Sequence, residues 1–208
     1  VTSSTGHDRI YGSALGNLLI AGAGNDSLYG GAGNDTLRND AGNDVLSGGG
    51  DTDQIFIGLN DGIDTIQGGE TGSDYDFLTF STSVAGPGVK VTFTAAETGT
   101  YSYTGGGSGS FTGIEEVDGS AGADTIDASL ASTGVTIKGG AGNDSILGGA
   151  SKDFLQGDDG NDTIFGEAGN DTIDGGLNND VIDGGIGVDS LRGGLGNDTL
   201  LGGDGNDS

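Results

Sequence analysis

Aliphatic residues recur at a fixed interval of nine positions over the last third of the chain. The eighth place of each nine-residue unit holds one of them: Ile146, Leu155, Ile164, Ile173, Ile182, Leu191 and Leu200. The places on either side are mostly polar, which is the alternation of a short, half-buried strand. A three-residue strand spans only about 10 Å and is not stable alone. The repeat therefore predicts a solenoid whose stacked strands bury a continuous column of Ile and Leu.

The other places of these units are equally regular, as in GGAGNDSIL from Gly139. Glycine mostly occupies the first, second and fourth places. There we expect backbone angles that side chains forbid, and carbonyl oxygens exposed close to one another. Six turn residues are thus followed by three strand residues. An aspartate fills the sixth place of every unit: Asp144, Asp153, Asp162, Asp171, Asp180, Asp189, Asp198 and Asp207.

The same rhythm occurs near the N-terminus, in four units that begin with AGAGNDSLY at Ala21 and end at Phe56. Their aspartates are Asp26, Asp35, Asp44 and Asp53. Two degenerate units precede them: SSTGHDRIY keeps Asp8, whereas GSALGNLLI has Asn17 where the aspartate belongs.

The middle of the chain breaks the nine-residue period. Alternating runs predict strands at VKVTF from Val89, TYSY from Thr100 and IEEV from Ile114, and GGGSG from Gly105 predicts a turn. Fragments of the repeat survive as Asp64-Thr65-Ile66, Asp76-Phe77-Leu78 and Asp124-Thr125-Ile126. We therefore expect a repeat block over residues 1–56, an irregular β-solenoid region over residues 57–138 and a second repeat block over residues 139–208.

Charge shows that something cationic is missing from this sequence. Its 208 residues include 48 glycines, 32 acidic and only 6 basic residues, so the net charge is −26. With 32 % hydrophobic residues, burial alone does not offset this repulsion and the backbone entropy. The charge disfavours nucleic acid and anionic membranes as partners. No cysteine is present for a disulfide or a cysteine zinc site, and no apolar run is long enough to span a membrane.

These units resemble the RTX (repeats-in-toxin) calcium-binding nonapeptide family, whose pattern is GGxGxDxUx with U a large aliphatic residue. Eight units in phase at the C-terminal end are a specific match. The resemblance implies an all-β fold, a right-handed parallel β-roll with two units per 18-residue coil, here in two blocks that flank a wider irregular β region. It also implies Ca²⁺ between turns stacked on one edge. One turn supplies carbonyls of its first and third places and its aspartate; the neighbouring turn supplies carbonyls of its second and fourth places and its own aspartate.

On this sequence the resemblance pairs aspartates that are 18 residues apart. The candidate pairs are Asp144–Asp162, Asp153–Asp171, Asp162–Asp180, Asp171–Asp189, Asp180–Asp198, Asp189–Asp207, Asp26–Asp44, Asp35–Asp53 and, less regular, Asp8–Asp26. Nine Ca²⁺ ions carry 18 positive charges, so they would reduce the net charge from −26 to −8. Hard carboxylate and carbonyl oxygens are the ligands that Ca²⁺ prefers.

Glycines of the second and fourth places complete the predicted set. They are Gly22, Gly24, Gly31, Gly33, Gly42, Gly140, Gly142, Gly149, Gly160, Gly169, Gly176, Gly185, Gly187, Gly194, Gly196, Gly203 and Gly205. Some turns depart from the pattern, at Asp51, at Ser151 with Lys152, and at Asn178, and we expect weaker sites or none there. Asn17 likewise puts a site shared with Asp35 in doubt.

No catalytic set accompanies the repeats, so we expect a protein that is not an enzyme. The single histidine, His7, lies beside Asp8 in a turn, and no HExxH motif, GxSxG motif or cysteine nucleophile occurs. The adjacent acids Glu115 and Glu116 are expected to lie on one strand facing opposite ways, or to cap an extra calcium site. A disordered acidic linker does not explain aliphatic residues at one fixed phase.

Three functions remain for such a module. The first is structural: a calcium-dependent segment of a surface layer, a filament or an adhesin. The second is the C-terminal secretion and folding module of an exported protease, lipase or polysaccharide epimerase; carbohydrate binding is the third. The resemblance implies type I secretion, with an extracellular or cell-surface location.

The partners expected are calcium and, through an apolar stripe on one face, other copies of the chain or neighbouring domains. That stripe aligns Leu147, Phe165, Asp183 and Leu201; the opposite face aligns Gln156, Asp174 and Arg192. No nucleic acid is expected, and scattered apolar residues are also ordinary on a surface.

Overall fold

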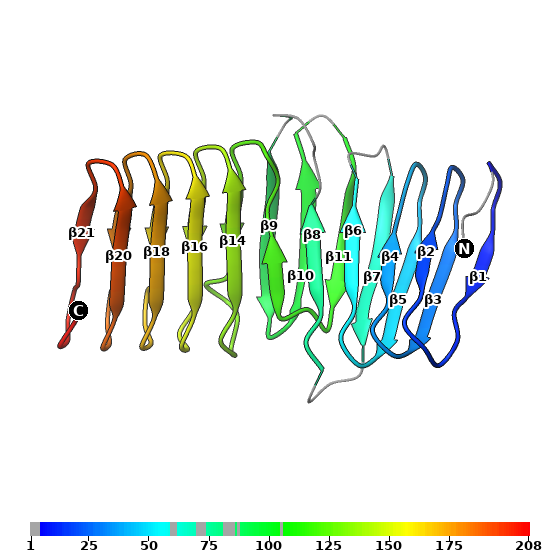
Figure 1. The fold of residues 1–208 in the computed structure, drawn as a ribbon, viewed down its shortest axis with the longest axis horizontal. Helices are drawn as coiled ribbons and strands as arrows, with labels where there is room; N and C mark the ends of the chain where they lie inside the picture. The colour runs from blue at the N-terminus through cyan, green and yellow to red at the C-terminus, as the bar shows by residue number, and fades with distance from the viewer. Residues whose placement is uncertain (1–4, 59–61, 70–73, 81–85, 87, 105) are drawn as a thin grey trace. The chain divides into compact units, whose positions relative to one another are not determined.

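The computed structural model describes residues 5–58, 62–69, 74–80, 86, 88–104 and 106–208, and this part of the chain consists of short strands and turns without a helix (Figure 1). It divides into two compact units. The first contains Val1–Ser81 and Thr98–Val117, and the second contains Thr82–Glu97 and Asp118–Ser208. Each unit is a parallel β-solenoid, in which the chain alternates between two sheets.

In the first unit, one sheet has the strand order β1-β3-β5-β7-β11-β10 and the other the order β2-β4-β6-β8-β12. The strands are β1 (Arg9–Tyr11), β2 (Leu18–Ile20), β3 (Ser27–Ala32), β4 (Thr36–Arg38), β5 (Val45–Gly50), β6 (Gln54–Ile57), β7 (Ile63–Gly69), β8 (Phe77–Phe80), β10 (Thr98–Tyr103), β11 (Ser108–Thr112) and β12 (Glu116–Asp118, whose last residue belongs to the second unit).

In the second unit, the two orders are β9-β13-β15-β17-β19-β21 and β14-β16-β18-β20. The strands are β9 (Val89–Ala95), β13 (Thr125–Asp127), β14 (Thr136–Ala141), β15 (Ser145–Leu147), β16 (Phe154–Asp159), β17 (Thr163–Phe165), β18 (Thr172–Leu177), β19 (Val181–Asp183), β20 (Ser190–Leu195) and β21 (Thr199–Leu201). From β14 onward, consecutive strands alternate between the sheets, and strands that pair are 18 residues apart, whereas β13 pairs with β15 at a separation of 20 residues.

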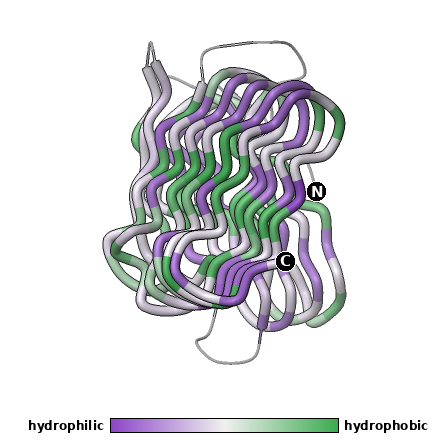
Figure 2. Tube along the Cα trace, turned by 90° about the vertical axis from the view of Figure 1, so that its left-hand side faces the viewer, coloured by the Kyte–Doolittle hydropathy of each residue, from purple (hydrophilic) through white to green (hydrophobic). Residues whose placement is uncertain are grey.

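The register keeps equivalent places of the repeat side by side. Ile146 pairs with Ile164, and Ile164 pairs with Ile182. Each of these side chains is at most 1 % exposed. A buried Leu or Ile contributes about 1.5–3 kcal/mol to stability, so the stacked column supplies the apolar core that one unit lacks. The hydrophobic stripes that run along the stacked coils are visible in Figure 2. The predicted aliphatic column is confirmed from Ile146 to Ile182, whereas Leu191 is half-buried and Leu200 is 44 % exposed.

The middle of the chain provides larger core side chains and departs from purely parallel pairing. The runs predicted around Val89 and Thr100 are strands β9 and β10. Strand β10 pairs antiparallel with β11, which itself runs parallel to β7. In the first unit, Phe80 and Tyr101 pack edge to face with ring centroids 5.0 Å apart, and Phe111 is fully buried. In the second unit Phe93 is fully buried.

The predicted outward alignments are also present. Leu147, Phe165, Asp183 and Leu201 are in register across β15, β17, β19 and β21. On the other sheet Asp174 lies opposite Arg192 and forms an ion pair with it at 3.1 Å. No helix in the described residues is long and apolar enough to cross a membrane.

Candidate metal centre

Turn glycines hold the backbone conformation that the repeat predicts. All of the predicted second- and fourth-place glycines except Gly149 have a positive φ, for example 107° at Gly176 and 134° at Gly142. Side chains rarely adopt this region because Cβ meets the neighbouring carbonyl oxygen. Four of the residues that replace glycine at these places also adopt it: Asp51, Asp158, Glu167 and Asn178, with φ of 70–75°. Those substitutions therefore preserve the path of the turn.

First-place glycines serve a different purpose, and the prediction of unusual backbone angles for them was wrong. A Cβ atom on Gly157 would overlap Oδ2 of Asp162, which belongs to the same turn, and one on Gly139 would overlap Oδ2 of Asp144. Glycine is thus needed because the carboxylate fills the space of a side chain. The same relationship holds at Gly30, Gly48, Gly139, Gly148, Gly157, Gly166, Gly175, Gly184, Gly193 and Gly202.

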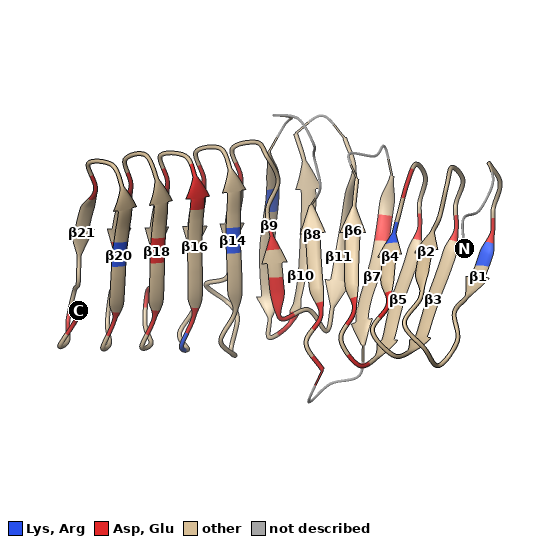
Figure 3. Cartoon of the chain, viewed as in Figure 1, with Lys and Arg blue, Asp and Glu red and all other residues tan. Residues whose placement is uncertain are grey.

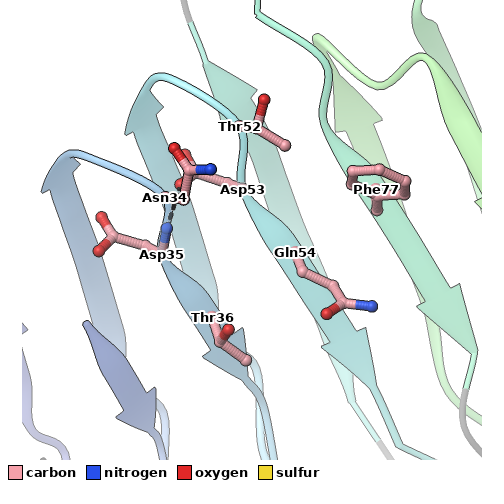
Figure 4. Close-up of a pocket in the computed structure, with 7 residues that line it drawn as sticks. All are labelled: Asn34, Asp35, Thr36, Thr52, Asp53, Gln54 and Phe77. Atoms are coloured by element: carbon pink, nitrogen blue, oxygen red, sulfur yellow. Dashed lines mark hydrogen bonds between the residues drawn. The ribbon is translucent and has the colours of Figure 1, made fainter. Parts of the chain in front are cut away.

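Aspartates of neighbouring turns on one edge are joined directly. The N–H group of Asp35 donates to Oδ1 of Asp53 at 2.8 Å, as the dashed line in Figure 4 shows. Equivalent bonds of 2.8–3.1 Å join each of the nine predicted pairs. The pairs that sequence spacing predicts are therefore neighbours in the structure. We call the space between two such turns a gap, and each series of joined residues an aspartate column.

The middle region extends three of these columns, which the 18-residue spacing missed. Asp44 donates its N–H to Asp64 at 2.9 Å, Asp53 donates to Asp76 at 2.7 Å, and Asp124 donates to Asp144 at 2.8 Å. Here the separations are 20, 23 and 20 residues. The signal for these members was the Asp-x-aliphatic fragment rather than the period.

The second unit has one column that runs from Asp124 through Asp144, Asp162 and Asp180 to Asp198, and another that runs from Asp153 through Asp171 and Asp189 to Asp207. In the first unit, one column runs from Asp8 through Asp26 and Asp44 to Asp64. The other contains Asp35, Asp53 and Asp76, whose N–H donates to Oε2 of Glu115 at 2.7 Å.

The second carboxylate oxygen is the unusual atom of each column. In nine members Oδ2 is buried and has no hydrogen-bond partner among the described residues: Asp26, Asp35, Asp44, Asp53, Asp144, Asp162, Asp171, Asp180 and Asp189. The ion pairs Arg38–Asp40, Lys138–Asp118 and Arg192–Asp174 do not involve any of them. Figure 3 shows the acidic residues concentrated at the turns and few basic residues beside them. A buried carboxylate oxygen without a partner costs several kcal/mol, so a cation beside these atoms would stabilise the stacked turns.

Carbonyl oxygens converge on the same gaps. The carbonyl oxygen of Gly142, at a fourth place, occupies the position that a Cβ atom on Gly160 of the next turn would need. The carbonyl oxygen of Asp158, at a second place, likewise occupies the position of a Cβ atom on Gly176. In the opposite direction, the first-place oxygen of Gly157 lies 2.8 Å from the Cβ position of Gly139, beside Asp144. Carboxylate and carbonyl oxygens from two turns thus face one another. This set of hard oxygens fits Ca²⁺.

In the described part of the chain, no group of three or more His, Asp or Glu side chains could hold a metal ion by itself. Carbonyl oxygens must therefore supply most ligands. In the first unit, a hollow of about 240 Å³ lies beside the gap between Asp35 and Asp53 (Figure 4). It is lined by these two aspartates and by Asn34, Thr36, Thr52, Gln54 and Phe77. All five of these side chains are uncharged and provide no counter-ion for the carboxylates.

Burial changes the proton affinity of the column carboxylates. It raises the pKa of Asp44, Asp53, Asp162 and Asp171 to about 6 and that of Asp144 to about 7, from the ordinary value of 3.8. Neighbouring column carboxylates add to this rise, and the N–H bond from the preceding turn opposes it. Burial therefore disfavours the ionised form of these carboxylates, and a divalent cation in the gap would stabilise that form.

Three predicted ligands lie in less enclosed positions. Asp8, Asp198 and Asp207 are half-buried, whereas the interior members of the columns are at most 2 % exposed. His7 accepts the N–H of Asn25 at its Nδ1 atom, at 2.9 Å, which gives it a structural role in the turn.

The prediction that Glu115 and Glu116 share a strand was wrong. Glu116 begins β12 and is 5 % exposed, whereas Glu115 precedes the strand. The carboxylate of Glu115 takes the place that an aspartate occupies elsewhere, because it accepts the N–H of Asp76.

Two of the turns that depart from the repeat pattern do not present an unpartnered carboxylate oxygen to the gap. Asn17 donates its side-chain N–H to Asp35 at 2.9 Å, so an amide replaces the anionic ligand. At Asp153, Oδ2 accepts the N–H of Gly149 at 2.7 Å. Gly149 is the one predicted glycine without a positive φ.

Stacked short strands, turn residues in the left-handed backbone conformation and columns of buried aspartates define a calcium-binding parallel β-roll. The family model of the RTX calcium-binding nonapeptide repeat matches residues 2–37, 11–46, 40–60, 110–130, 136–164, 147–182, 156–191 and 183–208. These ranges cover more than half of the chain, which therefore belongs to this family. No curated protein matches the chain as a whole.

Proposed function

We propose that this chain is a structural module of an extracellular or cell-surface protein, and that its repeats fold only when calcium fills the gaps. The observation that carries the proposal is the set of nine buried Oδ2 atoms without partners. A chain with a net charge of −26 gains little from forming such columns unless the charge is neutralised.

Bound Ca²⁺ would neutralise two carboxylates per gap and link neighbouring turns. The chain's own contribution is geometric: glycines at the second and fourth places point carbonyl oxygens into the gap, and first-place glycines leave room for Oδ2. Because these ligands are assembled only in the stacked state, the free energy of binding becomes free energy of folding.

This coupling suits a protein that is exported before it folds. Extracellular calcium modules work at about 10⁻⁴–10⁻³ M Ca²⁺. Below that concentration, charge repulsion keeps the repeats extended and able to pass through an exporter. We place the module in a surface layer, filament or adhesin, because its repeats form a continuous array of stacked turns within each unit.

A calcium titration followed by circular dichroism tests the proposal. Chelated protein is expected to lose most of its β signal, and added Ca²⁺ is expected to restore it cooperatively, while the same concentration of Mg²⁺ does not, because Mg²⁺ demands stricter octahedral geometry. A β signal that chelator leaves unchanged would exclude calcium-dependent folding.

A further inference from the structure

Three column aspartates differ from the nine open ones at Oδ2. They are Asp64, Asp124 and Asp153, and each is at most 3 % exposed. Their Oδ2 atoms accept hydrogen bonds from protein donors. Because burial is equally deep in both groups, the donors account for the difference.

In the second unit, the donor is the N–H group of the residue at the second place. Gly149 donates its N–H to Oδ2 of Asp153 at 2.7 Å, and Ser120 donates its N–H to Oδ2 and its hydroxyl group to Oδ1 of Asp124. Neither Gly149 nor Ser120 has a positive φ. In an open turn the second-place residue, such as Asp158 with φ of 72°, is in the left-handed region. Within the second unit, the conformation of this residue therefore distinguishes the closed turns from the open ones.

The Oδ1 atoms of these two aspartates are satisfied as well. Val135 donates its N–H to Asp153 at 2.9 Å, and Val89 donates to Asp124 at 2.7 Å. Burial raises the pKa of Asp153, and the N–H groups of Gly149 and Val135 limit this rise. Both oxygens of each carboxylate thus have donors within the protein.

In the first unit, side chains provide the donors. Oδ2 of Asp64 accepts the hydroxyl group of Tyr101 at 2.8 Å and the amide of Asn39 at 2.9 Å. Oδ1 accepts the N–H of Asp44, the preceding member of the column. Asn39 replaces a first-place glycine and is fully buried, and its own Oδ1 accepts the N–H of Gly58 at 2.9 Å.

We propose that protein donors replace calcium at Asp64, Asp124 and Asp153, so that the gaps that follow these residues bind no ion and stay ordered without it. This rests on the proposed calcium-dependent folding of the other turns. Asp64 is the last aspartate of its column in the first unit. Asp124 and Asp153 begin the two columns of the second unit. Each of these columns is therefore bounded by a turn that needs no metal.

Larger apolar side chains support such metal-independent order. Phe80 and Phe111 are buried in the first unit, and Phe93 is buried in the second unit. They belong to β8, β11 and β9 rather than to the regular repeats. A fully buried aromatic side chain exceeds Ile or Leu in buried area, so these strands depend less on the ion for their stability.

A matched pair of variants tests the assignment, because Asp153 and Asp162 share burial, place and the Oδ1 bond, and differ at Oδ2. The number of bound Ca²⁺ ions is measured by equilibrium dialysis at saturating calcium. Asp162→Asn is expected to lower it by one or two, and Asp153→Asn is expected to leave it at the wild-type number. An equal loss in both variants would overturn the proposal, whereas a wild-type chain that binds no calcium would refute the proposed function instead.

Hydrogen exchange of the wild-type chain in chelator needs no substitution. The amide groups of Gly149 and Ser120 are expected to exchange at least about tenfold more slowly than those of the equivalent second-place residues Gly176 and Gly185. Equal, fast exchange at all four would show that the closed turns also depend on calcium.

Discussion

The main-chain N–H of Asp144 donates a 2.8 Å hydrogen bond to Oδ1 of Asp162, the aspartate one coil further along the chain. Asp162 in turn donates to Oδ1 of Asp180 at 2.9 Å. Each interior carboxylate therefore has one oxygen committed to the preceding turn and one directed at the gap that follows. One residue takes part in two gaps, so a single substitution affects both.

Asp162→Ala is expected to weaken calcium-dependent folding more than Asp207→Ala. Asp162 contributes to the gaps shared with Asp144 and with Asp180, whereas Asp207 faces one described neighbour, Asp189. The calcium concentration at the midpoint of folding, followed by circular dichroism, should rise several-fold more for Asp162→Ala. The half-buried outer residue Asp183 provides the control, because Asp183→Ala removes the same charge away from the columns. Equal midpoints for Asp162→Ala and Asp207→Ala would refute shared carboxylates.

Leu155→Asp tests the aliphatic column. Leu155 is fully buried between Ile137 and Ile173, its partners in β14 and β18. A carboxylate there costs on the order of 5 kcal/mol, so the variant is expected not to fold even at saturating calcium. The neighbouring Phe154 points outward and is 43 % exposed. Phe154→Asp introduces the same group on the other face and is expected to cost about 1 kcal/mol. A melting temperature lowered equally by both would contradict the assignment of faces.

The regular part of the fold follows from the sequence because one period governs both the backbone and the chemistry. A nine-residue repeat with Asp and Ile two places apart, as at Asp162 and Ile164, fixes the strand, its inward face and the turn that precedes it. Two units per coil then place Asp162 beside Asp180. The nine pairs of neighbours were predictable for this reason.

Insertions in the middle region made the remaining column members unpredictable from the repeat period. Asp76 joins the column of Asp53 across 23 residues, and Glu115 joins Asp76 across 39 residues, so no fixed spacing identifies them. The antiparallel pair β10–β11 arises inside this insertion. The closed turns at Asp124 and Asp153 depend on the φ angle of a single residue, which the pattern of residue types does not determine.

Gly157→Ala tests the space that Oδ2 occupies. The new Cβ would overlap Oδ2 of Asp162 and the carbonyl oxygen of Gly175. Overpacking of this kind costs about 1–3 kcal/mol, and it displaces a ligand as well, so both thermal stability and calcium affinity are expected to fall. Gly50, whose Cβ would meet no atom within 4 Å, is the control. Gly50→Ala is expected to be neutral or to stabilise by about 0.5 kcal/mol. Calorimetry of the calcium-loaded proteins distinguishes the two, and equal effects would show that Oδ2 is elsewhere.

Without calcium, protons are expected to take over part of the role of the ion. The pKa of Asp144 is about 7 and those of Asp44, Asp53, Asp162 and Asp171 are about 6 in the folded chain, against 3.8 ordinarily. Between pH 4 and pH 7 the folded state therefore binds more protons than the unfolded state, and its stability falls as the pH rises through this window.

Chelated protein at pH 5 is accordingly expected to show more β structure by circular dichroism than chelated protein at pH 8. Calcium-loaded protein should respond in the opposite sense, because protonation of the same carboxylates competes with the ion and lowers its affinity below about pH 6. Asp162→Asn is already neutral at one column position, so its chelated form should lose less structure between pH 5 and pH 8 than the wild type. Chelated wild-type protein with the same β content at both pH values would show that the column carboxylates do not carry raised pKa values.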